Sequence, residues 1–115
     1  MHKEVHVKSS SSDSIYCVTF ELEGNTLEIH CDCQAGSYGK ICKHKLNLLE
    51  GATSNLVDLK EFNNISEILS KVNNSDFAAY NSSIKKIDNE IKRLNSEKKK
   101  LKKELEQMLF NGFEV

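Results

Sequence analysis

The sequence of 115 residues contains no proline and no tryptophan, and it has only five glycines and four cysteines. No apolar run approaches the roughly 20 residues that a membrane-spanning helix needs, so we expect no membrane segment. The opening residues 1–7 alternate charge, histidine and valine, so we expect no signal peptide and a cytoplasmic location. The 16 basic and 17 acidic residues give a formal net charge of −1, which excludes overall basicity as an argument for nucleic-acid binding.

The first part of the chain has the two-residue periodicity of β-strands. Residues 4–8 alternate valine with polar side chains, and residues 15–22 alternate with aromatic and β-branched enrichment. The segment 23–25, with glycine at its centre, predicts a hairpin turn, and a third strand continues through Leu27 and Ile29. We therefore expect a small three-stranded antiparallel sheet.

Helical spacing replaces this alternation after the glycines at 36 and 39. Leu46 and Leu49 indicate a short helix that ends before Gly51. A second helical stretch is expected over residues 59–72, and the polar segment 73–75 ends it. The apolar residues of that stretch are Leu59, Phe62, Ile65, Leu69 and Val72.

A long C-terminal helix, beginning at Asp76, carries a heptad repeat. Its first and fourth heptad positions are apolar over more than four heptads, except for Lys98. The expected seam contains Ile84, Ile87, Ile91, Leu94, Leu101 and Leu105, with Phe77, Tyr80 and Met108 at its ends.

These elements predict an α+β protein with three parts. Residues 1–51 are expected to form a module of sheet and short helix, residues 52–74 a connecting helical segment, and residues 75–115 a coiled-coil helix. The seam is too long for the N-terminal part to cover, so we expect it to pair with something else.

A homodimer is the favoured pairing. Ile84 and Ile91 at first positions, with Leu94 and Leu101 at fourth positions, favour a parallel two-stranded coil. The alternatives are an antiparallel dimer or antiparallel packing against the helix of residues 59–72.

Four metal-ligating side chains occur in two closely spaced pairs. Cys31 and Cys33 form a C-x-C pair, eight residues follow, and Cys42 and His44 form a C-x-H pair. Three thiolates and one imidazole make a complete tetrahedral set for one structural Zn²⁺ per chain. Because residues i and i+2 point apart on a regular helix, His44 can ligate only if Cys42 still lies in the turn before a helix.

Other uses of these cysteines are less consistent with the pattern. A Cys31–Cys33 disulfide would close a strained ring, and other pairings leave His44 without a role. A hydrolytic zinc keeps one position open for water, whereas four protein ligands would close this site. The zinc-deaminase pattern requires a glutamate and a proline-flanked C-x-x-C that the chain does not have. We therefore expect no enzymatic activity.

The C-x-C-x8-C-x-H pattern, with a strand ending at Ile29 before it and the basic Lys43-His44-Lys45 helix start within it, resembles the SWIM zinc-finger family. The resemblance covers about residues 4–51. It implies a small sheet and a following helix that share one zinc, with Cys31, Cys33, Cys42 and His44 as ligands. It also implies an interaction module for DNA or protein. The sequence departs from the family pattern in that we expect no accompanying ATPase or nuclease domain in it.

Several other polar residues are secondary candidates. Strand parity places Cys31 and Cys33 on the same face as Leu27 and Ile29, the face on which a following helix would pack. His30 and Cys17 have the opposite strand parity, and His2 and His6 would ligate only if His44 did not. Candidate contacts for a nucleic acid or a partner are Lys40, Lys43, Lys45 and Tyr38, and the lysine-rich residues 98–103. Those lysines also have simple explanations, because they balance thiolates or solvate a helix.

The predicted function is non-enzymatic binding of a protein partner by a zinc-stabilised module presented on a coiled-coil dimer. The alternative is a small DNA-binding or regulatory protein that uses the same module and its lysine clusters. The two differ in salt dependence, because DNA binding weakens steeply with added salt.

Overall fold

The computed structural model describes all residues, 1–115, and begins with a three-stranded antiparallel sheet. The strands are β1 (His2–Lys8), β2 (Ile15–Glu23) and β3 (Thr26–Cys31), in the order β1-β2-β3. The two-residue turn between β2 and β3 contains Gly24 with φ +58°, a value that favours glycine. The predicted α+β class, sheet and hairpin are confirmed.

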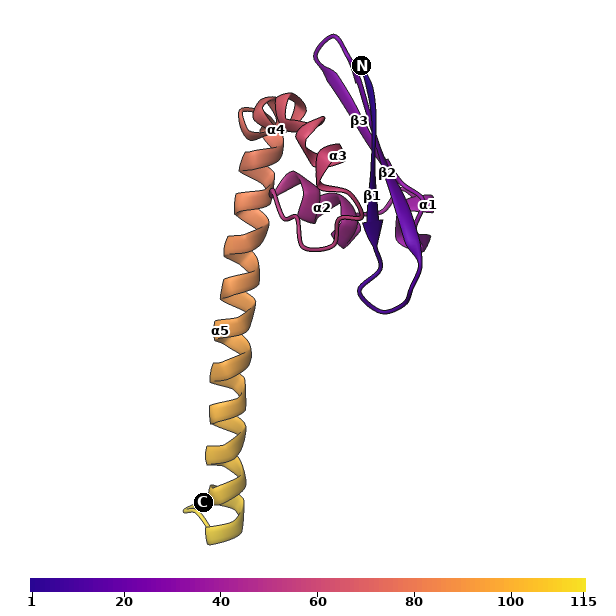
Figure 1. The fold of residues 1–115 in the computed structure, drawn as a ribbon. Coiled ribbons are helices and arrows are strands. Elements are labelled where there is room, and N and C mark those ends of the chain that lie inside the picture. The colour runs from indigo at the N-terminus through magenta and orange to yellow at the C-terminus, as the bar shows by residue number, and fades with distance from the viewer. The chain divides into compact units, whose positions relative to one another are not determined.

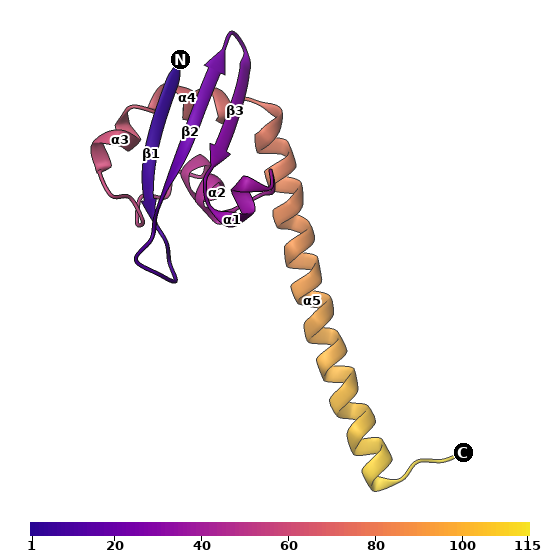
Figure 2. The same cartoon turned by 90° about the vertical axis from the view of Figure 1, so that its right-hand side faces the viewer.

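One face of the sheet forms the core. Val5, Val18 and Phe20 on this face are completely buried. The helices α2 (Lys43–Leu49) and α4 (Ser66–Asn73) lie against it, and α3 (Leu59–Asn63) lies beside the β1 edge of the sheet (Figures 1 and 2). The apolar residues that these segments bury there include Leu48, Ile65, Ile68 and Val72.

The helix predicted over residues 59–72 is in fact two helices, α3 and α4. Asn64 caps the end of α3, and Ile65, which is fully buried, precedes α4. Asparagine has low helix propensity, and the two consecutive asparagines Asn63 and Asn64 lie where the helix breaks. The break was not predicted because the apolar spacing continues through it.

Residues 55–57 cover the free edge of β1. The Lys8 N–H donates to the Asn55 carbonyl oxygen (2.7 Å), and the Val57 N–H donates to the His6 carbonyl oxygen (3.1 Å). An uncovered edge strand would expose unpaired backbone groups. This short segment therefore extends the hydrogen bonding of the sheet without adding a full strand.

The chain divides into two compact units, residues 1–75 and residues 76–115. The segment 52–74 lies within the first unit, where it supplies part of the buried core. None of the helices is both long enough and apolar enough to cross a lipid bilayer.

The second unit consists of helix α5 (Asp76–Asn111) and the four residues after it. Its 36 residues correspond to a length of about 54 Å at 1.5 Å per residue. No residue of α5 is buried. Seven apolar residues of the predicted seam are 42–64% exposed, namely Ile84, Ile87, Ile91, Leu94, Leu101, Leu105 and Met108.

Candidate metal centre

The first ligand pair lies where β3 ends. Cys31 is the last residue of β3 and is buried on the core face, as its strand parity predicted. Cys33 is the N-cap of the short helix α1 (Gln34–Ser37), and its Sγ accepts a hydrogen bond from the Gly36 N–H at 3.3 Å. The end of the strand and the start of the helix thus direct two sulfurs into one site.

Gly36 allows the chain to fold back closely over Cys31. A Cβ added at position 36 would lie 2.2 Å from the Cys31 carbonyl oxygen and 2.9 Å from the Cys31 Cβ. No side chain fits at such distances, so this position requires glycine. Gly39 serves the following turn differently, through a positive φ of +70°.

The second ligand pair lies at the start of α2. Cys42 is the N-cap residue with extended backbone dihedrals, and its Sγ is 3.5 Å from the Lys45 N–H that donates to it. His44 is in the first turn and is buried. The C-x-H spacing required Cys42 to lie in the turn before a helix, and the structure meets this condition. The Tyr16 ring packs against the imidazole with a centroid separation of 5.0 Å.

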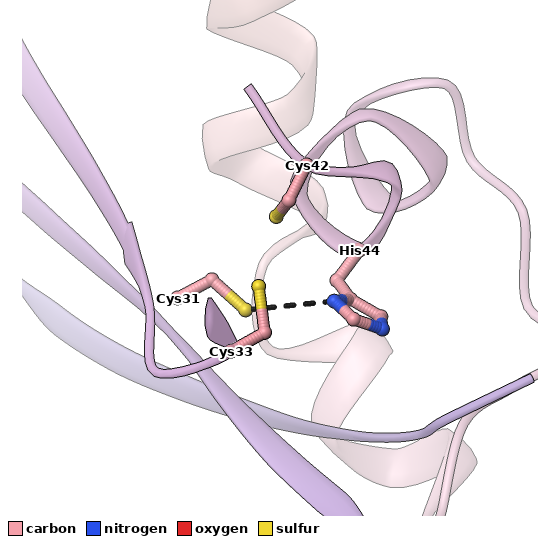
Figure 3. A group of neighbouring side chains, drawn as sticks. All are labelled: Cys31, Cys33, Cys42 and His44. Atoms are coloured by element: carbon pink, nitrogen blue, oxygen red, sulfur yellow. Dashed lines mark hydrogen bonds between the residues drawn. The ribbon is translucent and has the colours of Figure 1, made fainter. Parts of the chain in front are cut away.

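The four side chains converge on one point (Figure 3). One donor atom from each of Cys31, Cys33, Cys42 and His44 lies within 4.8 Å of every other, and all four residues are buried. The Cys31 Sγ and the His44 Nδ1 are 3.7 Å apart. Zinc–sulfur bonds of about 2.3 Å in a tetrahedron separate the sulfurs by roughly 3.8 Å. The cluster therefore needs only a small contraction to hold the metal.

The acid–base properties of the cysteines differ within the cluster. Burial raises the pKa of Cys31 to about 12. Burial acts in the same direction on Cys33, but the Gly36 N–H and the neighbouring thiols of Cys31 and Cys42 outweigh it, and the pKa of Cys33 is lowered. A divalent cation among the sulfurs stabilises all three as thiolates, the form that binds metal.

His44 is buried with few hydrogen bonds. Its Nδ1 faces the Cys31 sulfur, and its Nε2 has no hydrogen-bond partner in the protein. Burial, followed by the charge of Lys43, lowers the pKa of His44 and so favours the neutral imidazole. A neutral histidine at such a position is suited to metal ligation through Nδ1.

Comparison with protein families supports the same assignment. Residues 16–50 match the family model of the SWIM zinc finger, which confirms the predicted resemblance over that segment. No curated protein and no solved structure matches the chain. The segment is a SWIM zinc finger whose four buried donors fit one structural zinc. When bound, the zinc cross-links the end of β3 to the start of α2.

The structure places the other candidate histidines outside the cluster. His30 is exposed next to Glu28, and His2 contacts Glu21. His6 contacts Glu61, a residue that the sequence did not single out because it lies 55 positions away. Only His44 therefore joins the three cysteines, as the spacing predicted.

The candidate contact residues of the zinc loop are exposed. Tyr38 is 74% exposed. Ile41, which was not among the predicted contact residues, is 70% exposed. Two of the lysines contact their own unit, because Lys43 Nζ donates to Ser10 Oγ and Lys45 Nζ donates to the Lys40 carbonyl oxygen. These contacts give the lysines a local role in addition to any partner contact.

Proposed function

We propose that the protein is a non-enzymatic interaction module that binds a protein partner and presents its zinc finger on a coiled-coil homodimer. The observation that carries the proposal is the seam of α5, whose seven large apolar side chains from Ile84 to Met108 are 42–64% exposed. Burying one such side chain contributes about 1.5–3 kcal/mol, so a second helix that covers the seam would be strongly stabilised.

The donor set of the metal centre supports a structural role for zinc. Three thiolates and an imidazole complete a tetrahedron, so no position is left for water or a substrate. Catalysis by a hydrolytic zinc depends on such a position. The proposal therefore gives the zinc the role of fixing the loop between the two ligand pairs.

The charges that flank the seam favour a parallel dimer. Glu90, Glu97 and Glu104 all occupy the last position of their heptads. Antiparallel helices bring these positions opposite one another, which would place glutamates in repulsive pairs. Parallel helices instead bring Glu97 next to Lys102 of the second copy. Both zinc fingers would then lie at the same end of the coil.

The exposed side chains of the zinc loop form the proposed contact surface, which consists of Tyr38, Lys40 and Ile41. An exposed aromatic next to an exposed aliphatic side chain is more typical of protein contacts than of phosphate contacts. The metal holds this loop between its two ligand pairs, so the surface is ordered before it meets a partner. Such order reduces the entropy lost on binding.

Peptide display against the zinc-loaded protein tests this surface. The proposal expects enriched peptides that bind the wild type and lose at least about tenfold in affinity for Tyr38→Ala or Ile41→Ala, which is the loss of about 1.4 kcal/mol. Ile15→Ala, which changes another exposed apolar residue, is the matched control. Peptides that bind all these variants equally, or no enriched peptides, would contradict the proposal.

DNA binding is the second candidate, and the exposed residues 98–103 favour it, because five of these six are lysines. A protein that contacts phosphates through lysines loses affinity steeply as salt rises. Fluorescence anisotropy with a random duplex at 50 and 200 mM salt therefore separates the two functions. Tight binding at 50 mM that falls by 10³-fold or more at 200 mM would favour DNA as the ligand.

A further inference from the structure

The face of the sheet that points away from the core is rich in groups that bind metals. On β1 this face carries Glu4 and His6, and on β2 it carries Cys17 and Thr19. Their strand neighbours Val5 and Val18 point into the core. The face is therefore separate from the SWIM zinc site, whose Cys31 lies on the core side.

Three of these groups meet at one place. One donor atom from each of Glu4, His6 and Cys17 lies within 4.8 Å of the other two. His6 and Cys17 are direct cross-strand partners. The His6 N–H donates to Glu61 and its carbonyl oxygen accepts from Val57, so the pair is not hydrogen-bonded through its backbone. Side chains of such pairs approach each other more closely than those of hydrogen-bonded pairs.

Glu61 fixes the orientation of the His6 ring. Its Oε1 lies 2.9 Å from the His6 Nδ1, and its Oε2 accepts the His6 backbone N–H at 2.7 Å. When Nδ1 carries the proton and donates to this carboxylate, Nε2 keeps its lone pair. Metal-binding histidines have the same arrangement: one ring nitrogen donates a hydrogen bond to a carboxylate, and the other ring nitrogen binds the metal.

The electrostatic field at Cys17 attracts cations. Burial raises the pKa of the Cys17 thiol; the Thr19 hydroxyl beside it acts in the opposite direction, and the charges of Glu4, Asp32 and Glu61 raise the pKa further. The same carboxylates that oppose a thiolate favour a positive ion beside the sulfur. A bound divalent ion would reverse the effect and release the thiol proton.

We propose that Glu4, His6 and Cys17 bind a second divalent transition-metal ion, of the borderline-soft class that includes Zn²⁺ and Co²⁺. The donor set of one carboxylate oxygen, one imidazole nitrogen and one thiolate suits these ions better than Mg²⁺ or Ca²⁺, which prefer oxygen alone. With three protein donors the ion would keep a position for water. It would be held less tightly than the ion in the closed SWIM site.

Native mass spectrometry of the full chain titrated with Zn²⁺, and separately with Co²⁺, tests the second site. We expect two metal ions per chain at metal excess, the second removed first by a chelator. Glu4→Gln and Cys17→Ser should each bind one ion only. Glu28→Gln removes a carboxylate from the same face outside the cluster, and His30→Ala removes a histidine that contacts only Glu28, so both should still bind two.

Retention of the first ion and an unchanged circular dichroism spectrum show that a variant remains folded. Glu4 is exposed, so Glu4→Gln keeps the test valid even if Cys17→Ser destabilises the sheet. A wild-type protein that binds one ion even at metal excess would overturn the proposal. So would Glu4→Gln and Cys17→Ser variants that both bind two ions, as Glu28→Gln should.

Discussion

A Cβ at position 36 would lie 2.2 Å from the carbonyl oxygen of Cys31, so the backbone of Gly36 packs directly on that of the first zinc ligand. This contact sets the path of the chain between the two ligands Cys31 and Cys33 and the rest of the zinc loop. Gly36 is not a metal ligand, but through this contact it affects the geometry of the metal site.

Gly36→Ala should therefore weaken zinc binding and lower the melting temperature. Overpacking of this kind costs about 1–3 kcal/mol of stability. The cost of Gly36→Ala should lie at the upper end of this range, because the added Cβ meets backbone atoms, which cannot move aside as a flexible side chain can. Gly39→Ala is the matched control, because a Cβ there meets nothing within 4 Å and only the positive φ is strained, by about 1–2 kcal/mol. Chelator competition and thermal melts of both variants measure the difference. Equal effects of the two substitutions would contradict the packing argument.

Loss of a zinc ligand should unfold one unit and spare the other. Cys33→Ser or Cys42→Ser removes a thiolate from a site whose metal contributes an apparent 10–16 kcal/mol in small modules, about as much as the whole stability of a domain. We expect residues 1–75 to lose protection from hydrogen exchange while α5 keeps its helical circular dichroism.

Cys17→Ser is the control for these ligand variants, because Cys17 lies outside the SWIM site and the variant should keep the zinc bound there. Metal analysis accompanies the spectra of every variant. A Cys42→Ser protein that is fully folded without metal would refute the structural role of zinc.

A charge placed in the seam of α5 should break the proposed dimer. Leu94→Lys puts two ammonium groups into the apolar interface of a pair and removes the burial of two leucines, about 3–6 kcal/mol in all. The dissociation constant should rise at least about 100-fold. Ser96→Lys, on the side of the helix opposite the seam, should leave it unchanged. Sedimentation equilibrium gives both constants, and a wild type that is monomeric at high concentration would end the dimer hypothesis.

Stability of the zinc finger should fall as the pH falls. Burial lowers the pKa of His44 below its ordinary value of 6.5, so the folded state favours the neutral ring. A group with a depressed pKa contributes stability above pH 6.5 and loses it as the pH drops through the folded value. Zinc binding acts in the same direction, because protons compete with the metal for the ligands. Melting temperatures should decrease from pH 7.5 to 5, and constant values over this range would contradict the assignment.

Local patterns were enough to predict the sheet, the hairpin and the four-residue cluster. Strand parity placed Cys31 on the core face, and the i, i+2 spacing required Cys42 to precede a helix. Both rules depend only on neighbouring residues and backbone geometry. That is why they could be applied without knowing the tertiary structure.

Long-range contacts determine what the sequence analysis missed. Glu61 reaches His6 across 55 positions, and no local pattern links the two residues. Ile65, between α3 and α4, is fully buried in the core, and the continuous helical spacing of the apolar residues conceals the break before it. The close approach of Gly36 to Cys31 is likewise visible only once the chain has folded back.

X-ray absorption spectroscopy of the full chain loaded with one equivalent of Zn²⁺ tests the central claim most directly. The predicted first shell contains three sulfurs at about 2.3 Å and one nitrogen at 2.0–2.1 Å, and His44→Ala should remove the nitrogen while keeping the sulfurs. A shell of mainly oxygen and nitrogen donors, or one with fewer than three sulfurs, would contradict the zinc site described above.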